Sequence, residues 1–296
     1  MPNEQSNGLL KDFTKWLHED GKAVKTIESY VNDVEKFQQF LTTTEETGPL
    51  TRYGVVQYRQ WMDNQLAIST INKKINSLKV FNDFLIEAKH LEHQVVFPRK
   101  DQVKVAHGSE KKVKVLDEHQ VNQLLAYVEN GKKVSKRNKA ITYVLLYCGL
   151  RVSELCSLTV DDMDFLSRVV TVRGKGGKYR EVGLRQDVID VVKEYMKEER
   201  VQNPHHESKY LFLSQRSPKM HREAVGYWMR KVGEELGFHL HPHKLRHTLF
   251  TKLVKSGSGV DLSLIRDIAG HSLLQTTAQF YFHHSREEKQ NALDSL

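Results

Sequence analysis

The chain has 296 residues, and 39% of them are hydrophobic, which is enough for a packed core and excludes wholesale disorder. The net charge is +8 and unevenly spread: residues 1–98 carry 11 Lys and Arg against 13 Asp and Glu, and residues 99–296 carry 34 against 24. A basic second half suits a polyanionic partner, because cations that neutralise phosphates release counterions. At this length we expect two domains.

Cysteine content and hydropathy exclude further classes of protein. With only Cys148 and Cys156 there is no disulfide framework, and we expect both to be buried, small apolar side chains in a reducing compartment. No apolar run of 18 residues and no charged-then-apolar leader is present. The sequence therefore predicts a cytoplasmic protein without a membrane partner.

The first third of the chain shows helical periodicity. Apolar residues recur at helical spacing over 9–17 and 27–41, with a break at Gly21, and again over 53–66 and 71–85. The polar stretch Thr42–Gly48, followed by Pro49, predicts a loop. We therefore predict an all-α domain of about four helices over residues 1–97.

Residues 98–114 are predicted to be a basic linker. They lack periodicity and contain Pro98 and Gly108. The basic residues of this stretch are Arg99, Lys100, Lys104, Lys111, Lys112 and Lys114. A flexible basic segment can cross a DNA backbone, and it can equally be a plain surface linker. The residues alone leave both interpretations open.

The second domain is predicted to cover residues 115–296. An acid-rich start at Asp117 precedes a helical pattern, and a buried helix over 140–148 ends at Gly149. Alternation over 164–172, a glycine-rich turn and a second apolar alternation at 179–182 predict a β-hairpin. Since the rest is mostly helical, the predicted fold class is mainly α, with a small antiparallel sheet in the second domain.

This domain contains a spaced set of cations and histidines. The set comprises Arg151, Lys175, His243, Arg246 and His271. Such groups meet the needs of a pentacoordinate phosphate, which requires donors for its oxygens and a proton source for the departing sugar hydroxyl. The guanidinium fork of arginine matches two phosphate oxygens, which lysine cannot copy. The set predicts phosphoryl transfer on DNA without a metal or other cofactor.

Alternatives exist for individual residues. Arg151 is close enough in sequence to pair with Glu154, and Lys175 at a polar turn is by itself an ordinary surface lysine. In a helix, His243, Arg246 and His247 lie on one face. Four histidines fall within nine residues, at positions 239, 241, 243 and 247. No carboxylate or cysteine joins them, and Arg246 would repel a cation, so no metal site is predicted.

Taken together, the motifs resemble the phage-integrase family, the tyrosine recombinases, and most of all its short Xer-like members. The resemblance runs from about residue 9 to His283. It rests on Gly149–Leu155, Gly174–Lys178, His243–His247, Gly270-His271 and Phe280-Tyr281. Any one of these pieces would be weak evidence alone, but the combination is highly specific.

The resemblance implies a SAM-like helical core-binding domain followed by the family's catalytic domain. It assigns phosphate contacts and proton transfer to Arg151, His243, Arg246 and His271, and protonation of the leaving 5′ oxygen to Lys175. Glu154 is expected to orient Arg151, and His247 to pack beneath the site. The residues expected to contact DNA are Lys73, Lys74, Lys79, Arg99, Lys100 and Lys178, the last a less favoured substitute for Lys175.

The nucleophile position departs from the family pattern. The family's tyrosine stands nine residues after the histidine of Gly-His, where this chain has Phe280. Two interpretations compete: Phe280 replaces the tyrosine by substitution, or Tyr281 attacks in a shifted register. A helix turns by about 100° per residue, so a neighbouring hydroxyl would point away from the phosphate. Because Thr276–Gln279 aligns without a gap, we favour the first interpretation, in which this chain is inactivated.

The family implies site-specific strand exchange on double-stranded DNA through a 3′-phosphotyrosyl intermediate, without ATP or metal. It also implies a homo-oligomer, with a dimer on each site and a tetramer in the synapse. The apolar residues of the tail 287–296 suit docking onto a neighbouring protomer. We expect an Xer-like or transposon resolvase role. The alternatives are a type IB topoisomerase-like enzyme and a non-catalytic DNA-binding accessory protein.

Overall fold

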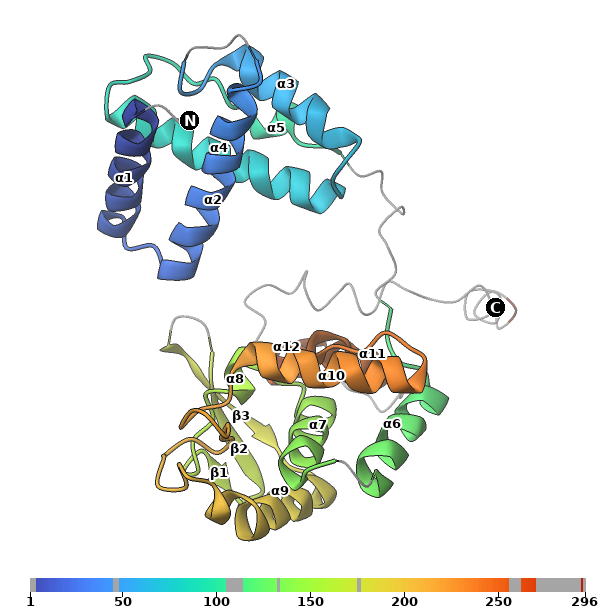
Figure 1. Ribbon diagram of the computed structural model, residues 1–296. Helices are drawn as coiled ribbons and strands as arrows, with labels where there is room; N and C mark the ends of the chain where they lie inside the picture. Colours follow the sequence, from blue (N-terminus) through green and yellow to red (C-terminus); the bar gives the residue numbers. More distant parts are fainter. Residues whose placement is uncertain are drawn as a thin grey trace. The chain divides into compact units, whose positions relative to one another are not determined.

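The computed structural model describes residues 4–44, 48–104, 114–131, 134–174, 177–255, 262–269 and 294. The chain forms two compact units, Met1–Glu110 and Lys111–Leu296 (Figure 1). Both are built mainly from helices, and the second contains a three-stranded antiparallel sheet. The predicted mainly α fold class is confirmed. In the part of the chain that the structure describes, no helix is long and apolar enough to span a membrane.

Among the described residues of the N-terminal unit, four long helices form most of the structure, in agreement with the prediction of about four helices. They are α1 (Glu4–Glu19), α2 (Val24–Leu41), α3 (Arg52–Asp63) and α4 (Ile68–Glu87). Their apolar stripes meet in one core, where the rings of Phe13 and Phe81 pack edge to face with centroids 5.0 Å apart. The periodicity predicted these helices because burial of one apolar face drives their packing.

The start of the predicted linker belongs to this unit instead. Pro98–Asp101 forms a short helix, α5, which packs on α3 and α4. The guanidinium of Arg52 donates to both carboxylate oxygens of Asp101, at 2.8 and 2.7 Å. Beyond it, Asn72 bonds the backbone N–H and carbonyl of Val103 at 2.8 and 3.0 Å. The boundary at residue 97 is therefore corrected, since these long-range polar contacts leave no signal in local periodicity.

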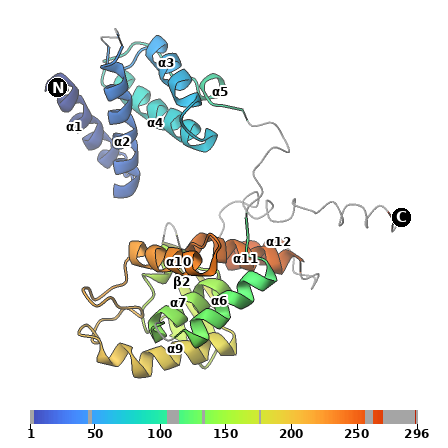
Figure 2. The same ribbon diagram turned by 45° about the vertical axis from the view of Figure 1, so that its right-hand side comes forward.

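The second unit surrounds a larger core. Its helices are α6 (Glu118–Asn130), α7 (Lys136–Cys148), α8 (Val152–Leu155), α9 (Gln186–Glu198), the 3-10 helix η2 (Arg200–Gln202), α10 (Arg222–Leu236), α11 (Pro242–Lys255) and α12 (Leu262–Ala269). α7 is buried along most of its length and contacts α9 and α11, which lie on either side of it in both views (Figures 1 and 2). This packing holds α8 and α11 close together at the end of α7.

The sheet has the strand order β1-β2-β3, with β1 at Met163–Asp164, β2 at Val169–Arg173 and β3 at Tyr179–Gly183. Val170 pairs with both Met163 and Val182. The single strand predicted over 164–172 is therefore wrong. The carboxylate of Asp164 accepts hydrogen bonds from two backbone N–H groups at 2.9 Å, and this closes a turn between β1 and β2.

Candidate active site

Arg151 is held at the start of α8 by Glu154. One carboxylate oxygen of Glu154 accepts from the backbone N–H of Arg151 at 2.8 Å, and the other accepts from its guanidinium at 2.9 Å. Glu154 is buried, while the side chain of Arg151 is 39% exposed. The carboxylate thus anchors the arginine from the protein side and leaves part of its guanidinium accessible to a ligand.

Glu154 also binds a second arginine, Arg180 of β3. The two terminal nitrogens of Arg180 donate to its two carboxylate oxygens at 3.0 and 2.9 Å. Burial tends to raise the pKa of Glu154, but the hydrogen bonds from Arg180 and Arg151 outweigh burial and lower it. Glu154 is therefore ionised at neutral pH, with two guanidinium groups around it.

Sequence reasoning did not single out Arg180. A signal was present, because Arg180 lies two residues before the buried Val182 and alternation along a strand places both on the same side. An arginine on the inward side of a strand needs a polar partner, which here is Glu154.

Arg246 stands on α11, and its side chain is almost fully buried, at 2% exposure. It donates to the backbone carbonyl of Gly149, and its guanidinium lies 4.8 Å from the ring centroid of Phe250. Gly149 ends α7 with φ of 61°, where a Cβ would lie 2.8 Å from Leu249 and 3.0 Å from Phe250. The glycine therefore permits both the left-handed turn and the close approach of α11 that places Arg246.

The electrostatic surroundings of Arg246 favour an anion. Burial lowers its pKa to about 9, and repulsion from Arg151 adds to this effect. Arg246 still carries its charge at neutral pH. Arg151 and Arg180 both repel Arg246, and the carboxylate of Glu154, which binds these two arginines, attracts it. This excess of positive charge can hold a phosphate and stabilise charge that develops on its oxygens.

His243 lies one helical turn before His247 on the same helix. Their ring centroids are 4.1 Å apart at 71°, an edge-to-face contact. His243 is exposed at the rim of the site, and partial desolvation lowers its pKa, with repulsion from Arg246, His241 and Arg151 adding to this. It is therefore neutral at pH 7 in the DNA-free protein and can accept a proton.

The structure brings together Arg151, Glu154, His243, Arg246 and His247 of the predicted site. Lys178 is exposed, and its backbone carbonyl accepts from Gly174 at 2.7 Å beside the hairpin turn. Four predicted positions lie outside the described residues: Lys175, His271, Phe280 and Tyr281. The predicted docking tail 287–296 also lies outside them, apart from Asp294. Within the described ranges, no group of three or more His, Cys, Asp or Glu side chains is arranged to hold a metal ion.

Two family models match this chain. The phage integrase family model covers residues 114–288, and the phage integrase N-terminal SAM-like domain model covers residues 10–89. Together they span most of the sequence and both units. The chain belongs to the phage integrase family. It is a tyrosine recombinase.

Relatives of the recombinase match over nearly their whole length. The TnP I resolvase of Bacillus thuringiensis is 29% identical over 276 residues, which are 91% of this chain and 93% of the relative. The tyrosine recombinase XerC of Pediococcus pentosaceus is 30% identical over 298 residues and 96% of each chain. A crystal structure of XerA recombinase matches with a TM-score of 0.54 at 25% identity and covers 98% of both chains.

The N-terminal lysines of the recombinase differ in their surroundings. Lys74 is buried, and its Nζ lies 2.9 Å from Asp33, which is also buried. The structure contradicts a DNA contact for Lys74, because helical spacing alone cannot tell a solvated lysine from one paired inside. Lys73 also approaches Asp33 at 2.9 Å but is 54% exposed. Lys79 is partly exposed and pairs with Asp83.

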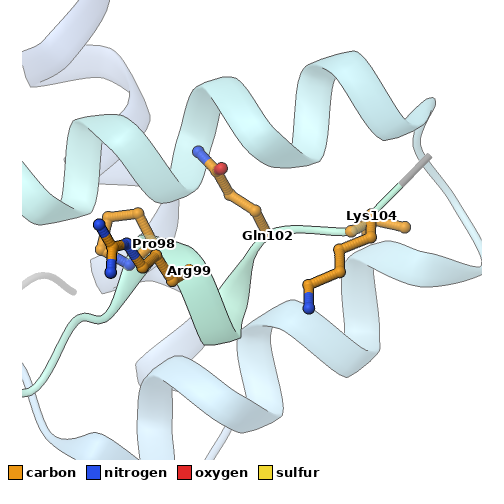
Figure 3. Close-up of a pocket in the computed structure, with 5 residues that line it drawn as sticks. Pro98, Arg99, Gln102 and Lys104 are labelled. Atoms are coloured by element: carbon orange, nitrogen blue, oxygen red, sulfur yellow. The ribbon is translucent and has the colours of Figure 1, made fainter. Parts of the chain in front are cut away.

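The basic residues of α5 lie on the surface of the N-terminal unit. Arg99 and Lys100 are both exposed, and the Nζ of Lys100 lies 5.5 Å from the ring centroid of Phe97. Arg99 and Lys104 border a shallow hollow, which Pro98, Gln102 and Val103 complete (Figure 3). Because α5 is tied to α3 through Asp101, these cations extend from a fixed backbone.

Proposed function

We propose that this recombinase, when it carries a tyrosine at position 280, exchanges DNA strands at a specific site through a 3′-phosphotyrosyl intermediate, without metal or ATP. The observation that carries this proposal is the cluster of Arg151, Arg180 and Arg246 around the single carboxylate of Glu154. A phosphodiester bound there would receive donors from two helices that the end of α7 holds together. Preorganised donors of this kind stabilise the charge of a transition state without rearranging.

The proposed reaction conserves bond energy. A tyrosine oxygen attacks phosphorus, the bond from phosphorus to the 5′ oxygen breaks, and that oxygen takes a proton from Lys175. His243 accepts the proton of the attacking tyrosine. Arg151 and Arg246 hold the non-bridging oxygens, and His271 adds a donor. The 5′-hydroxyl of the partner duplex then attacks the phosphotyrosine and regenerates the tyrosine.

We place the nucleophile at position 280, so the chain with Phe280 binds its site without cleaving it. The assembly in this proposal is a dimer on each site and a tetramer in the synapse, with the tail 287–296 docked on a neighbour. The similarity to the TnP I resolvase and to the tyrosine recombinase XerC supports a resolvase or Xer-like role. In this proposal the protein is cytoplasmic, because its substrate is duplex DNA.

Binding in this proposal uses phosphate contacts from both units. Lys73, Lys79, Arg99, Lys100 and Lys178 are the cations that we assign to them. The logarithm of affinity should then fall linearly with the logarithm of salt concentration, with a slope of roughly −0.9 per phosphate neutralised. An affinity for duplex DNA that hardly changes with salt would contradict this assignment.

The decisive experiment uses a suicide substrate, a duplex nicked close to the scissile phosphate, so that after cleavage the short fragment carrying the free 5′-hydroxyl diffuses away and its loss traps the covalent adduct. The chain with Phe280 should bind and form no adduct, and Phe280→Tyr should form one that denaturing gels resolve. Tyr281→Phe in the Phe280→Tyr background should retain it. An adduct formed by the unaltered chain and lost on Tyr281→Phe would assign the nucleophile to Tyr281. Binding without any adduct from Phe280→Tyr would favour a non-catalytic DNA-binding protein.

A further inference from the structure

Arg180 connects three segments of the catalytic unit through one side chain. From β3 it donates to both carboxylate oxygens of Glu154 on α8, and its Nε donates to the backbone carbonyl of Ile268 on α12 at 3.0 Å. The side chain is only 12% exposed. β3 contacts α12 directly.

These segments adjoin three of the proposed catalytic positions in the sequence. Arg151 is bound by the carboxylate that Arg180 holds, and Lys175 lies five residues before Arg180 in the sequence. The carbonyl of Ile268 lies three residues before His271. We infer that Arg180 is a positioning residue of the strand-exchange site. By binding both Glu154 and the carbonyl of Ile268, it fixes the position of Arg151 relative to the end of α12. This inference rests on the proposed function.

The planar guanidinium explains why an arginine is needed here. Its two terminal nitrogens form a fork that fits a carboxylate, while Nε points away along another edge of the same rigid plane. One side chain can therefore fix the distance between Glu154 and α12. A lysine ammonium at this position can neutralise Glu154 but cannot bind the carboxylate as a fork and reach the carbonyl of Ile268. Arg180→Lys thus keeps the charge and removes the geometry.

The test measures adduct formation on the suicide substrate at saturating DNA, in the Phe280→Tyr background. We expect Arg180→Lys to slow adduct formation by about 100-fold with little change in DNA affinity, because a misplacement of about 1 Å has an effect of this size. Ethylguanidinium ion should restore part of the rate of Arg180→Ala. Arg173→Lys is the matched control, since Arg173 is exposed on the neighbouring strand and lies over the ring of Tyr179 at 6.0 Å. A rate for Arg180→Lys equal to that of this control would overturn the inference.

Two further measurements keep the result decisive. If Arg180 variants bind DNA poorly, the double variant Arg180→Lys/Glu154→Gln is compared with each single variant. A loss of cleavage rate in the double variant no larger than that of one single variant supports the inference that the two residues act together. Additive losses of rate overturn the inference. If the Phe280→Tyr parent forms no adduct, the proposed function fails. Hydrogen–deuterium exchange of the DNA-bound chain then tests whether Arg180 positions α12. Faster exchange over 262–269 in Arg180→Lys, but not in Arg173→Lys, supports the inference, and unchanged exchange overturns it.

Discussion

The ammonium of Lys74 lies 2.9 Å from the carboxylate of Asp33, and both side chains are buried between α2 and α4. Ser77 donates to the same carboxylate at 2.8 Å. Burial tends to raise the pKa of Asp33, but Lys74, Lys73 and Ser77 together lower it. Asp33 is therefore an ionised group inside the N-terminal unit, and Lys74 holds two helices together instead of facing DNA.

Asp33→Ala should strongly destabilise the N-terminal unit. Removing the carboxylate leaves the charge of Lys74 buried without its main partner, which typically costs about 3–5 kcal/mol. Urea unfolding, followed by hydrogen–deuterium exchange of peptides from α2 and α4, measures the change in the free energy of unfolding. Lys79→Gln removes a partly exposed ion pair and serves as the control, with an expected change below about 1 kcal/mol. Equal effects of the two variants would rule out a stabilising buried pair.

Gly149→Ala should damage both stability and cleavage. A left-handed backbone costs an alanine roughly 1–2 kcal/mol, and its Cβ would also press on Leu249 and Phe250 of α11. Displacement of α11 would move Arg246, so adduct formation in the Phe280→Tyr background should fall. Gly237→Ala is a matched control because Gly237 also has a positive φ, 76°, but a Cβ there meets nothing within 4 Å. It should lose stability and keep its cleavage rate.

Arg246→Lys in the Phe280→Tyr background should nearly abolish cleavage although the charge is retained. Loss of one preorganised donor to a transition state typically costs about 100- to 1000-fold in rate, and lysine cannot form the fork. Affinity for duplex DNA, measured by gel shift, should change little. Near-normal adduct formation would place Arg246 outside the site.

His243 should take up a proton when DNA binds at a pH between its free and bound pKa values; at higher pH it stays neutral in the complex and can accept the proton of the tyrosine. Its pKa is lowered in the free protein, and a phosphate beside it would favour the protonated form and raise the pKa. Between the two pKa values the complex holds more protons than the free protein, so affinity should rise as the pH falls through that window and level off above it. Calorimetric titrations in buffers of different ionisation enthalpy measure the uptake.

His243→Gln should remove this proton uptake. His241→Gln is the control, because the pKa of His241 is also lowered, mainly by partial burial, next to His239. Proton uptake that persists in His243→Gln and disappears in His241→Gln would contradict this prediction and assign the proton to His241.

Both cysteines should resist thiol reagents in the folded protein. Burial raises the pKa of Cys148 to about 12 and that of Cys156 to about 11, and thiolate is the reactive form. Labelling with a chromogenic disulfide at pH 8 should be slow until denaturant is added. Rapid labelling of the native protein would contradict their burial, which the composition also predicted.

Much of the fold was predictable because its determinants are local. Apolar spacing is repeated within each helix, so α1–α4 follow from sequence, as does the end of α7 at Gly149. The motif residues also carry their own chemical meaning, since arginine forks and histidines are typical of phosphate sites. The combination of these motifs was therefore enough to predict the family.

Other features depend on residues that lie far apart in the chain. Packing decides three such features: whether Lys74 faces solvent or Asp33, whether Pro98–Asp101 is free or tied by Arg52, and which partner Arg180 takes. A charged residue at a given helical or strand position satisfies the same local pattern in either case. Sequence by itself determined the four long helices of the N-terminal unit, the chemistry of the motifs and the family. Only the tertiary structure decided which charges pair in the interior, because that choice balances the cost of desolvation against partners supplied by distant segments.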